Sequence, residues 1–165
     1  MHIIAAVGKD WEIGNNGQLL CKIEDDMRNF KQRTEHKIVI MGRKTLDSLP
    51  NHAPLPNRTN IVLTHKDPDD FNDYDNLLIM HSVEEIVEYC KDSVAYCIGG
   101  GEIYKQFLPY CKVAVITKID ESFEADTYFP DLDEMANWVQ ISESEERIGN
   151  NMKYRFCIYK NTNVI

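Results

Sequence analysis

Short runs of apolar residues alternate with amphipathic segments along most of this chain of 165 residues. A short apolar run bounded by turn signals is typical of a strand that is buried on both faces. Apolar positions at helical spacing predict the helices between these strands. Strands that alternate with helices favour an α/β sandwich with a mostly parallel sheet. The predicted strands are 2–7, 37–41, 60–63, 77–80, 94–98 and 112–119, and the predicted helices are 24–33, 43–49, 83–90 and 102–108.

The last part of the chain has a different pattern. Residues 138–144 and 153–159 both have strand character, and the turn Gly149-Asn150-Asn151 lies between them without a helix. This arrangement predicts an antiparallel pair at the edge of the sheet. The length fits one domain, residues 1–165, in a single three-layer sandwich.

Composition and charge exclude several classes of protein. Apolar residues make up 43% and charged residues 27%, which is typical of a globular protein and not of a disordered one. The net charge of −9 disfavours nucleic acids and anionic membranes as partners. Residues 22–66, however, hold nine basic residues against five acidic ones. This basic segment indicates a small anionic ligand, or else a chance grouping on a solvated surface.

Cysteine and histidine usage gives no sign of a disulfide framework or of a metal site. The five cysteines are odd in number, irregularly spaced and without a CxxC pair. The five histidines have no ligand spacing, so no metal is expected. The N-terminal apolar run lacks the basic start of a signal peptide, and no stretch approaches the roughly 18 apolar residues of a membrane helix. A cytoplasmic protein is the expectation.

Two junctions between a strand and a helix carry candidate phosphate chemistry. Gly99-Gly100-Gly101 would let backbone N–H groups approach a phosphate at a helix N-terminus. Arg43 and Lys44 oppose the dipole of their own helix, and an anion held between them would relieve that cost. The alternatives are a tight connection for the glycines and a solvated pair for the two cations.

Two further residues are candidates for contacts with a polar ligand. Asp26 lies on the apolar side of its predicted helix, beside Met27 and four residues before Phe30, where a carboxylate needs a partner. A cationic or amidine-like ligand edge is one such partner, and a simple interaction with the helix dipole is the alternative. Arg58, at the entrance to a strand, could clamp a carboxylate or be an ordinary surface residue.

The order of these motifs resembles the dihydrofolate reductase family over roughly residues 2–160. The segments that carry the resemblance are IIAAVGKDWEIGNNGQLL, EDDMRNFK, KIVIMGRKTLDSL, LPNRTNIVLT, CIGGGEIYKQFLPYC, ITKID and ADTYFPD. The resemblance implies a central eight-stranded sheet with seven parallel strands and four flanking helices. It also implies an oxidoreductase that transfers hydride from NADPH to 7,8-dihydrofolate, giving the tetrahydrofolate of one-carbon and thymidylate metabolism. A monomer that binds antifolate inhibitors is expected.

The resemblance assigns roles to residues of the substrate site. Asp26 would bind the pterin amino group and ring nitrogen and favour protonation of the adjacent imine nitrogen, with the proton arriving from water. Thr117 would bond both Asp26 and the pterin, and Arg58 would bind the α-carboxylate of the glutamate tail. Residues lining the same cleft would be Ala6, Leu19, Met27, Phe30 and Leu49.

The resemblance also assigns a cofactor site and a mobile loop. Gly99-Gly100 would be a cis peptide, Thr64 and His65 would help to hold the 2′-phosphate, and 14–23 would close over the nicotinamide. The cofactor residues implied are Ala6, Ile13, Gly14, Gly42, Arg43, Lys44, Thr45, Leu63, Thr64, His65, Ile98, Gly99, Gly100, Gly101, Glu102, Ile103 and Tyr104.

Two positions depart from the family pattern. Leu20-Cys21 stands where the family usually has Pro-Trp, and a thiol is a weaker donor than an indole for a water near the pterin. Glu102 would be unfavourable beside a pyrophosphate unless it points away or pairs with Lys105. Two alternative functions therefore remain open at this point: a pyrimidine reductase of riboflavin synthesis with the same fold, and a folate- or nucleotide-binding protein without turnover.

Overall fold

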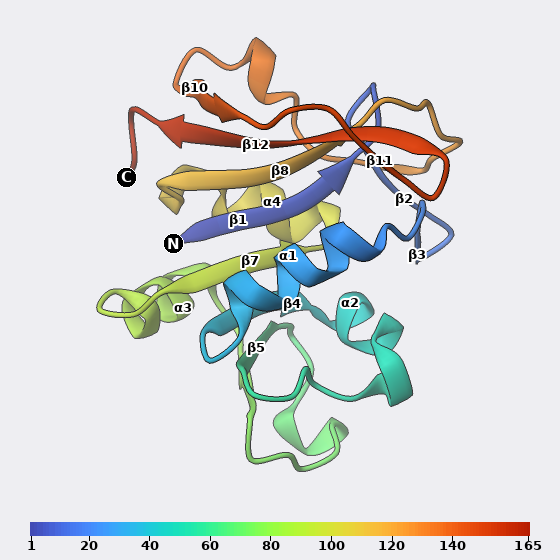
Figure 1. Ribbon diagram of the computed structural model, residues 1–165. Helices are drawn as coiled ribbons and strands as arrows, with labels where there is room; N and C mark the ends of the chain where they lie inside the picture. Colours follow the sequence, from blue (N-terminus) through green and yellow to red (C-terminus); the bar gives the residue numbers. More distant parts are fainter.

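A computed structural model describes residues 1–165 as one large sheet with helices on both faces (Figure 1). The strand order is β10-β12-β8-β1-β7-β4-β5-β6, and β11 pairs with β12. All neighbouring pairs from β8 to β6 are parallel, whereas β12 is antiparallel to both β8 and β10. The strands are β1 (His2–Val7), β4 (Ile38–Gly42), β5 (Thr59–Leu63), β6 (Leu77–Met80), β7 (Ala95–Gly99), β8 (Val113–Ile119), β10 (Trp138–Glu143), β11 (Arg147–Gly149) and β12 (Met152–Asn161).

The predicted α/β sandwich with a mostly parallel sheet is confirmed. The antiparallel strand is β12, which lies one position inside the edge strand β10. Four α-helices flank the sheet: α1 (Glu24–Thr34), α2 (Arg43–Ser48), α3 (Val83–Cys90) and α4 (Gly101–Phe107). Four short 3-10 helices lie in the connections: η1 (Pro50–His52), η2 (Pro68–Asp70), η3 (Leu108–Tyr110) and η4 (Leu132–Glu134).

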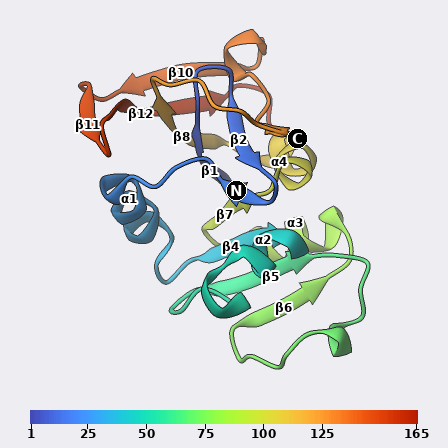
Figure 2. The same cartoon turned by 90° about the vertical axis from the view of Figure 1, so that its right-hand side faces the viewer.

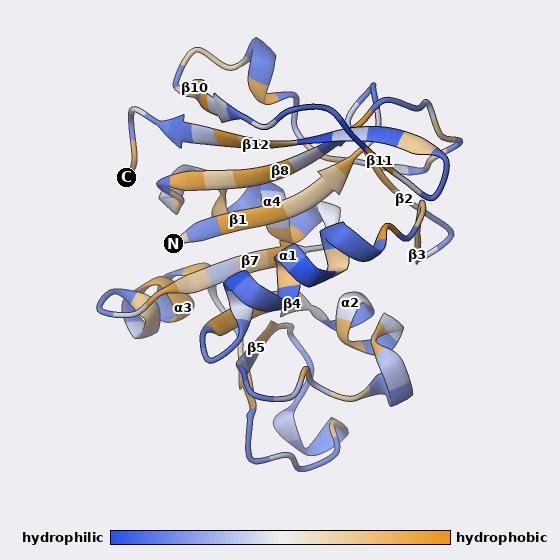
Figure 3. Cartoon of the chain, in the orientation of Figure 1, coloured by the Kyte–Doolittle hydropathy of each residue, from blue (hydrophilic) through white to orange (hydrophobic).

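The alternation of side chains along each strand divides the core between the two faces. On β1, Ile3 and Val7 belong to the large core formed with α3 and α4, whereas Ile4 packs on the other face near Phe30 of α1. Figure 2 shows α1 on the opposite side of the sheet from α3 and α4. In Figure 3 the central strands are mainly apolar, while α1 is mainly hydrophilic. The sheet is therefore covered on both faces, as a parallel sheet requires.

The C-terminal hairpin forms as expected from its turn residues. Asn150 and Asn151 both adopt left-handed backbone conformations, with φ of 50° and 59°. Asparagine tolerates this region better than most residues, and two consecutive such residues match the twist of a tight hairpin. The turn joins β11 to β12 and brings Gly149 opposite Met152.

A second, small sheet of three strands was not predicted from the sequence. Its order is β3-β2-β9, with β2 (Glu12–Asn15), β3 (Gln18–Leu19) and β9 (Thr127–Tyr128). Strands of two to four residues are too short to show an alternating pattern. The small sheet contains much of the segment expected to be a mobile loop, and it joins that segment to residues more than 100 positions later.

No helix of the structure is long and apolar enough to cross a membrane.

Candidate active site

The predicted site residues meet at the carboxyl ends of four parallel strands. Ala6 at the end of β1 pairs with Thr117 of β8, and Met41 of β4 pairs with Gly99 of β7. Helix α1 begins beside the first pair, while α2 and α4 begin at the ends of β4 and β7. Ligands of open α/β sheets bind at this end of the strands.

Asp26, in the first turn of α1, is linked to β8 by a short hydrogen bond. The hydroxyl of Thr117 donates to Oδ1 of Asp26 at 2.5 Å, so the bond expected between these two residues is present. Burial raises the pKa of Asp26 because it disfavours the charged form, and the bond from Thr117 partly opposes this shift. Oδ2 of Asp26 accepts no hydrogen bond from the chain, so it remains open to a ligand.

Cys21, which replaces the family's usual tryptophan, lies close to Asp26. It packs with Ala6, Ile23 and Tyr154 near the end of β1. Burial and the charge of Asp26 both raise the pKa of the Cys21 thiol, so the thiol stays neutral at pH 7. This position therefore supplies a small, weakly polar surface in place of an indole N–H donor.

Apolar residues of the expected substrate cleft differ in their exposure. Phe30 packs against the sheet through Ile4 and Tyr96, and Leu49 packs with the small cluster around Leu46. Met27 is 53% exposed on the surface of α1. Its exposure leaves an apolar surface beside Asp26 that a ligand could cover.

Arg58 is buried and lacks an acidic partner. Its side chain is 8% exposed, its Nε donates to Oγ1 of Thr34 at 2.9 Å, and its Nη1 donates to the carbonyl of Pro56 at 2.7 Å. Its guanidinium carbon lies 6.0 Å from the centre of the Phe30 ring. Burial lowers the pKa of Arg58, although the group stays charged at neutral pH. The Nη2 group makes no hydrogen bond within the chain, so it can meet a carboxylate from outside.

Helices α2 and α4 begin without side-chain caps. Their N-cap residues are Gly42 and Gly100, and neither helix start has a side chain that accepts its free N–H groups. Each helix start therefore presents backbone donors and the positive end of a dipole. Two such starts at neighbouring strand ends suit an extended anion with several phosphate oxygens.

The glycines at these junctions are required by close contacts. A Cβ atom on Gly42 would lie 3.0 Å from Ile103, and one on Gly101 would lie 2.7 Å from Thr127. Gly99 has φ of +111°, and a Cβ there would meet the ring of Tyr104 at 2.9 Å. The peptide bond from Gly99 to Gly100 is cis, as the resemblance implied.

The charged residues near these helix starts are only partly paired. Arg43 makes an ion pair with Asp47 at 2.8 Å, whereas Lys44 is exposed and unpaired. Glu102 is exposed and forms a 3.6 Å pair with Lys105, one of the two arrangements that relieve its repulsion of a phosphate. Thr45 lies near Gly100, since a Cβ there would be 3.8 Å from the Thr45 hydroxyl.

Several expected cofactor residues face the interior instead. Ile103 is 8% exposed, and the hydroxyl of Tyr104 donates to the carbonyl of Ile4 at 2.9 Å. Only the backbone of these two residues is available at the start of α4. Ile13 and Leu63 pack at the border of the main core, and Ile98 packs on the other face.

The end of β5 supplies the residues expected at a 2′-phosphate. His65 is exposed, and the carbonyl of Thr64 contacts Nδ1 of His81 at 2.7 Å. His81 was not expected here from the sequence. His81 directly follows β6, which pairs with β5 in the sheet. Because the ends of neighbouring parallel strands lie side by side, this position after β6 was the only sign in the sequence that His81 would lie near Thr64.

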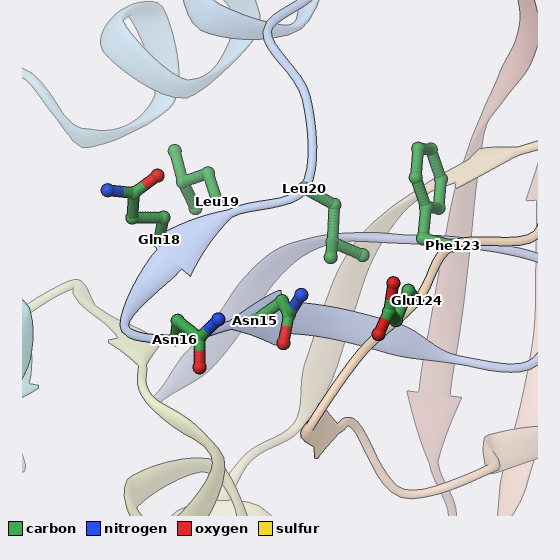
Figure 4. Close-up of a pocket in the computed structure, with 7 residues that line it drawn as sticks. All are labelled: Asn15, Asn16, Gln18, Leu19, Leu20, Phe123 and Glu124. Atoms are coloured by element: carbon green, nitrogen blue, oxygen red, sulfur yellow. The ribbon is translucent and has the colours of Figure 1, made fainter.

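A hollow that Asp26 does not line lies between the small sheet and the segment before β9 (Figure 4). Its volume is about 350 Å³, and Leu19, at 77% exposure, lines it. The expected position of Leu19 in the substrate cleft therefore stays a prediction. The remaining lining residues are Asn15, Asn16, Gln18, Leu20, Phe123 and Glu124.

Other polar contacts at the site's border were also missed. Asp126 holds the small sheet, because its Oδ2 accepts from the N–H of Asn16 at 2.9 Å while its own N–H donates to the carbonyl of Gly14. Asp25 accepts from the Tyr154 hydroxyl at 2.7 Å. These contacts join residues more than 100 positions apart, so no local pattern reveals them.

The fold and the site define an α/β protein whose strand ends present a partly buried carboxylate and, on the same edge of the sheet, helix starts suited to phosphates. A family model described as dihydrofolate reductase matches residues 1–161. The chain is 33% identical over 156 residues to a dihydrofolate reductase of Buchnera aphidicola, covering 94% of each chain. It is 33% identical over 154 residues to that of Bacillus subtilis, covering 92% of this chain and 88% of the other.

A solved structure shows the same likeness in three dimensions. Dihydrofolate reductase from Enterococcus faecalis, complexed with NADP(H) and RAB-propyl, superposes with a TM-score of 0.84 at 33% identity. The superposition covers 97% of this chain and 95% of the other. The chain belongs to the dihydrofolate reductase family.

Proposed function

We propose that this protein reduces 7,8-dihydrofolate to 5,6,7,8-tetrahydrofolate with NADPH. The observation that carries the proposal is the position of Asp26, bonded to Thr117 of β8 at 2.5 Å and at the same end of the sheet as the glycine junctions of β4 and β7. Family membership across residues 1–161 supports the same reaction. The solved relative complexed with NADP(H) supports the choice of cofactor.

The residues at the strand ends fit NADPH. The free N–H groups at the starts of α2 and α4 suit its phosphates, and both helix starts depend on a glycine, because a Cβ on Gly42 or Gly101 would meet Ile103 or Thr127. We assign Arg43, Lys44 and Thr45 to the phosphates, and Thr64 and His65 to the 2′-phosphate. When bound, the cofactor supplies the hydride.

Asp26 serves the pterin in this proposal. Its Oδ1 is fixed by Thr117, and its Oδ2 is free to accept from the 2-amino group or a ring nitrogen. A negative charge there stabilises the cationic, protonated imine that accepts hydride more readily than the neutral one. The raised pKa of Asp26 places its titration nearer to neutral pH than that of a surface aspartate.

The remaining substrate residues bind and orient in this proposal. Phe30, Met27 and Leu49 offer apolar contacts to the rings, and Ala6 leaves room at the end of β1. Arg58 would take the α-carboxylate of the glutamate tail through the Nη2 group that no residue of the chain uses. A planar, buried guanidinium suits a carboxylate better than an exposed lysine does.

We also propose that residues 1–165 act as one domain, as a monomer, in the cytoplasm. The main sheet joins strands from both ends of the chain, which supports a single folding unit. The odd number and irregular spacing of the cysteines support a reducing compartment.

The test is the oxidation of NADPH by the purified protein. Absorbance of NADPH should fall when dihydrofolate is added and should stay constant without it, and tetrahydrofolate should appear in equal amount. No oxidation at micromolar enzyme, with NADPH bound tightly, would instead favour a binding protein without turnover. Preference for a pyrimidine substrate of riboflavin synthesis would also overturn the proposal.

A further inference from the structure

Glu12 is a buried carboxylate with no cation beside it. It is 1% exposed, and no lysine, arginine or histidine lies within ion-pair distance. Burial of a charge is costly unless hydrogen bonds replace water, so this side chain needs strong donors. It lies at the start of β2, directly before Ile13 and Gly14 of the expected cofactor site, which gives it a place in the architecture of that site.

Two backbone N–H groups from distant parts of the chain satisfy this carboxylate. Oε1 accepts from Asp10 at 2.5 Å, and Oε2 accepts from Phe123 at 2.6 Å. The first bond closes the turn that leads into β2, and the second reaches the segment between β8 and β9. One side chain therefore holds two segments that are separated by 111 positions.

Gly8 supplies an independent sign that the carboxylate has a built site. A Cβ atom on Gly8 would lie 2.8 Å from both oxygens of Glu12 and 2.8 Å from the ring of Phe123. Gly8 does not have a positive φ, so backbone conformation does not explain a glycine here. The space that the missing Cβ leaves is the space that admits the carboxylate.

The two segments joined by Glu12 border the proposed cofactor site. On one side, β2 continues through Ile13 and Gly14, and Gly14 pairs with Thr127 of β9. On the other side, Thr127 lies against Gly101 at the start of α4, where a Cβ would approach it to 2.7 Å. Phe123 also lines the hollow drawn in Figure 4, together with Leu20.

We infer that Glu12 is a positioning residue for cofactor binding: its carboxylate fixes β2 against the 120–129 segment, and so fixes Ile13 and Gly14 relative to the start of α4. The inference rests on the proposed NADPH site. It assigns to Glu12 an effect on the affinity for NADPH that exceeds its effect on dihydrofolate binding.

Glu12→Gln is the first test. The amide keeps the size of the side chain but has only one acceptor, so it loses one of the two backbone bonds. NADPH should bind about five- to tenfold more weakly in a fluorescence titration, as expected for coupling between neighbouring segments. The KM for dihydrofolate should remain close to that of the wild type, whereas the melting temperature should fall by roughly 2–4 °C or more, because a buried backbone N–H loses its acceptor.

Two further variants separate geometry from charge. Glu12→Asp keeps the charge but is one methylene shorter, so it cannot reach both N–H groups and should also weaken NADPH binding. Glu121→Gln is the matched control, because Glu121 lies on the same segment but is exposed and has no side-chain partner. It should bind NADPH as the wild type does.

Hydrogen exchange on the wild type gives a second measurement that does not depend on the folding of a variant. Because coupling between sites is reciprocal, NADPH should slow exchange of the amide hydrogen of Phe123. Wild-type affinity in Glu12→Gln, or exchange at Phe123 unchanged by NADPH, would overturn the inference alone. A wild-type protein that does not bind NADPH would overturn the proposed function as well.

Discussion

At the scale of single residues, burial decides the chemistry of this site more than residue type does. Three acids occupy the first turn of α1, and all three suit the helix dipole. Glu24 is exposed to solvent, and Asp25 is paired, so neither offers a carboxylate that is both shielded from water and unpaired. Asp26 alone combines partial burial, one protein donor and one unpartnered oxygen.

Replacement of Asp26 by asparagine separates its role in turnover from its role in the fold. Asp26→Asn should lower kcat/KM for dihydrofolate at neutral pH by roughly 100-fold or more, a size typical of the loss of an acid–base or electrostatic group. Steady-state oxidation of NADPH measures this loss. Glu24→Gln on the same turn is the control and should retain activity. Wild-type turnover in Asp26→Asn would remove Asp26 from its proposed role.

The raised pKa of Asp26 gives the same variant a predicted effect on stability. A carboxyl group whose pKa is raised by folding binds protons more tightly in the folded state, so the wild type should lose stability as pH rises through the window above the ordinary carboxyl pKa. Asp26→Asn has no such charge and should be as stable as the wild type, or more stable, at pH 7. Urea unfolding at several pH values tests the sign.

At the scale of elements, the position of α1 depends on its contact with the C-terminal hairpin. The Tyr154 hydroxyl on β12 donates to Asp25 at 2.7 Å, and Arg147 on β11 donates to the same oxygen at 3.1 Å. These bonds lower the pKa of Asp25, with the bond from Tyr154 as the largest cause. The hairpin thereby fixes the turn of α1 that contains Asp26.

Tyr154→Phe should remove this link while leaving the ring in place. The loss of one hydrogen bond to a charged but partly exposed group should lower the free energy of unfolding by about 1 kcal/mol. For a chain of this size, this corresponds to a fall of roughly 2–4 °C in melting temperature. Tyr89→Phe, at an exposed position on α3, is the control and should change neither.

The pH dependence of this link follows from the direction of the Asp25 shift. A carboxyl group with a depressed pKa stabilises the fold above its unfolded pKa and loses that contribution as pH falls through the folded pKa. The difference in stability between wild type and Tyr154→Phe should therefore be full at neutral pH and should shrink in acid. A difference that is constant down to pH 3 would contradict this account.

At the scale of the whole molecule, net charge and local charge have opposite signs where the ligand binds. The chain carries −9 overall, and both proposed ligands are anions. Arg43, Lys44 and Arg58 all lie in the basic segment 22–66, at the carboxyl ends of β4 and at the entrance to β5. Arg43 is partly neutralised by Asp47, which leaves Lys44 and Arg58 as the unpaired cations of the site.

Salt should therefore weaken the binding of NADPH. Between about 0.05 M and 0.5 M NaCl the Debye length falls well below the size of the site, so the attraction of the local cations is screened. Titration with NADPH at each salt concentration measures how steeply the affinity falls with salt. In Lys44→Gln this dependence should be weaker. Affinity that rises with salt would mean that the charge of the whole molecule outweighs the basic segment.

The sequence by itself determined most strands, all four helices and the residues that carry the proposed chemistry. A near-continuous apolar run identified β1 with its observed bounds, because strands buried on both faces need apolar residues at most positions, and a short apolar run between turn residues identified the edge strand β6. The glycine junctions and Asp26 were visible because their residue types fit poorly with the local structure alone. These signals are local. They predict the elements correctly because the backbone hydrogen bonds of a helix, and the buried face of a helix or strand, follow from residues close together in the sequence.

Only the tertiary structure decided which residues share a carboxylate, a donor or a close contact. The small sheet, the bonds of Glu12 to Phe123 and of Asp25 to Tyr154, and the burial of Tyr104 join segments that are distant in sequence. The strands of the small sheet are too short, and the other contacts too few, to produce a periodic pattern of apolar residues in the sequence. A period arises from repeated burial along one element, whereas a single long-range hydrogen bond leaves no pattern around it.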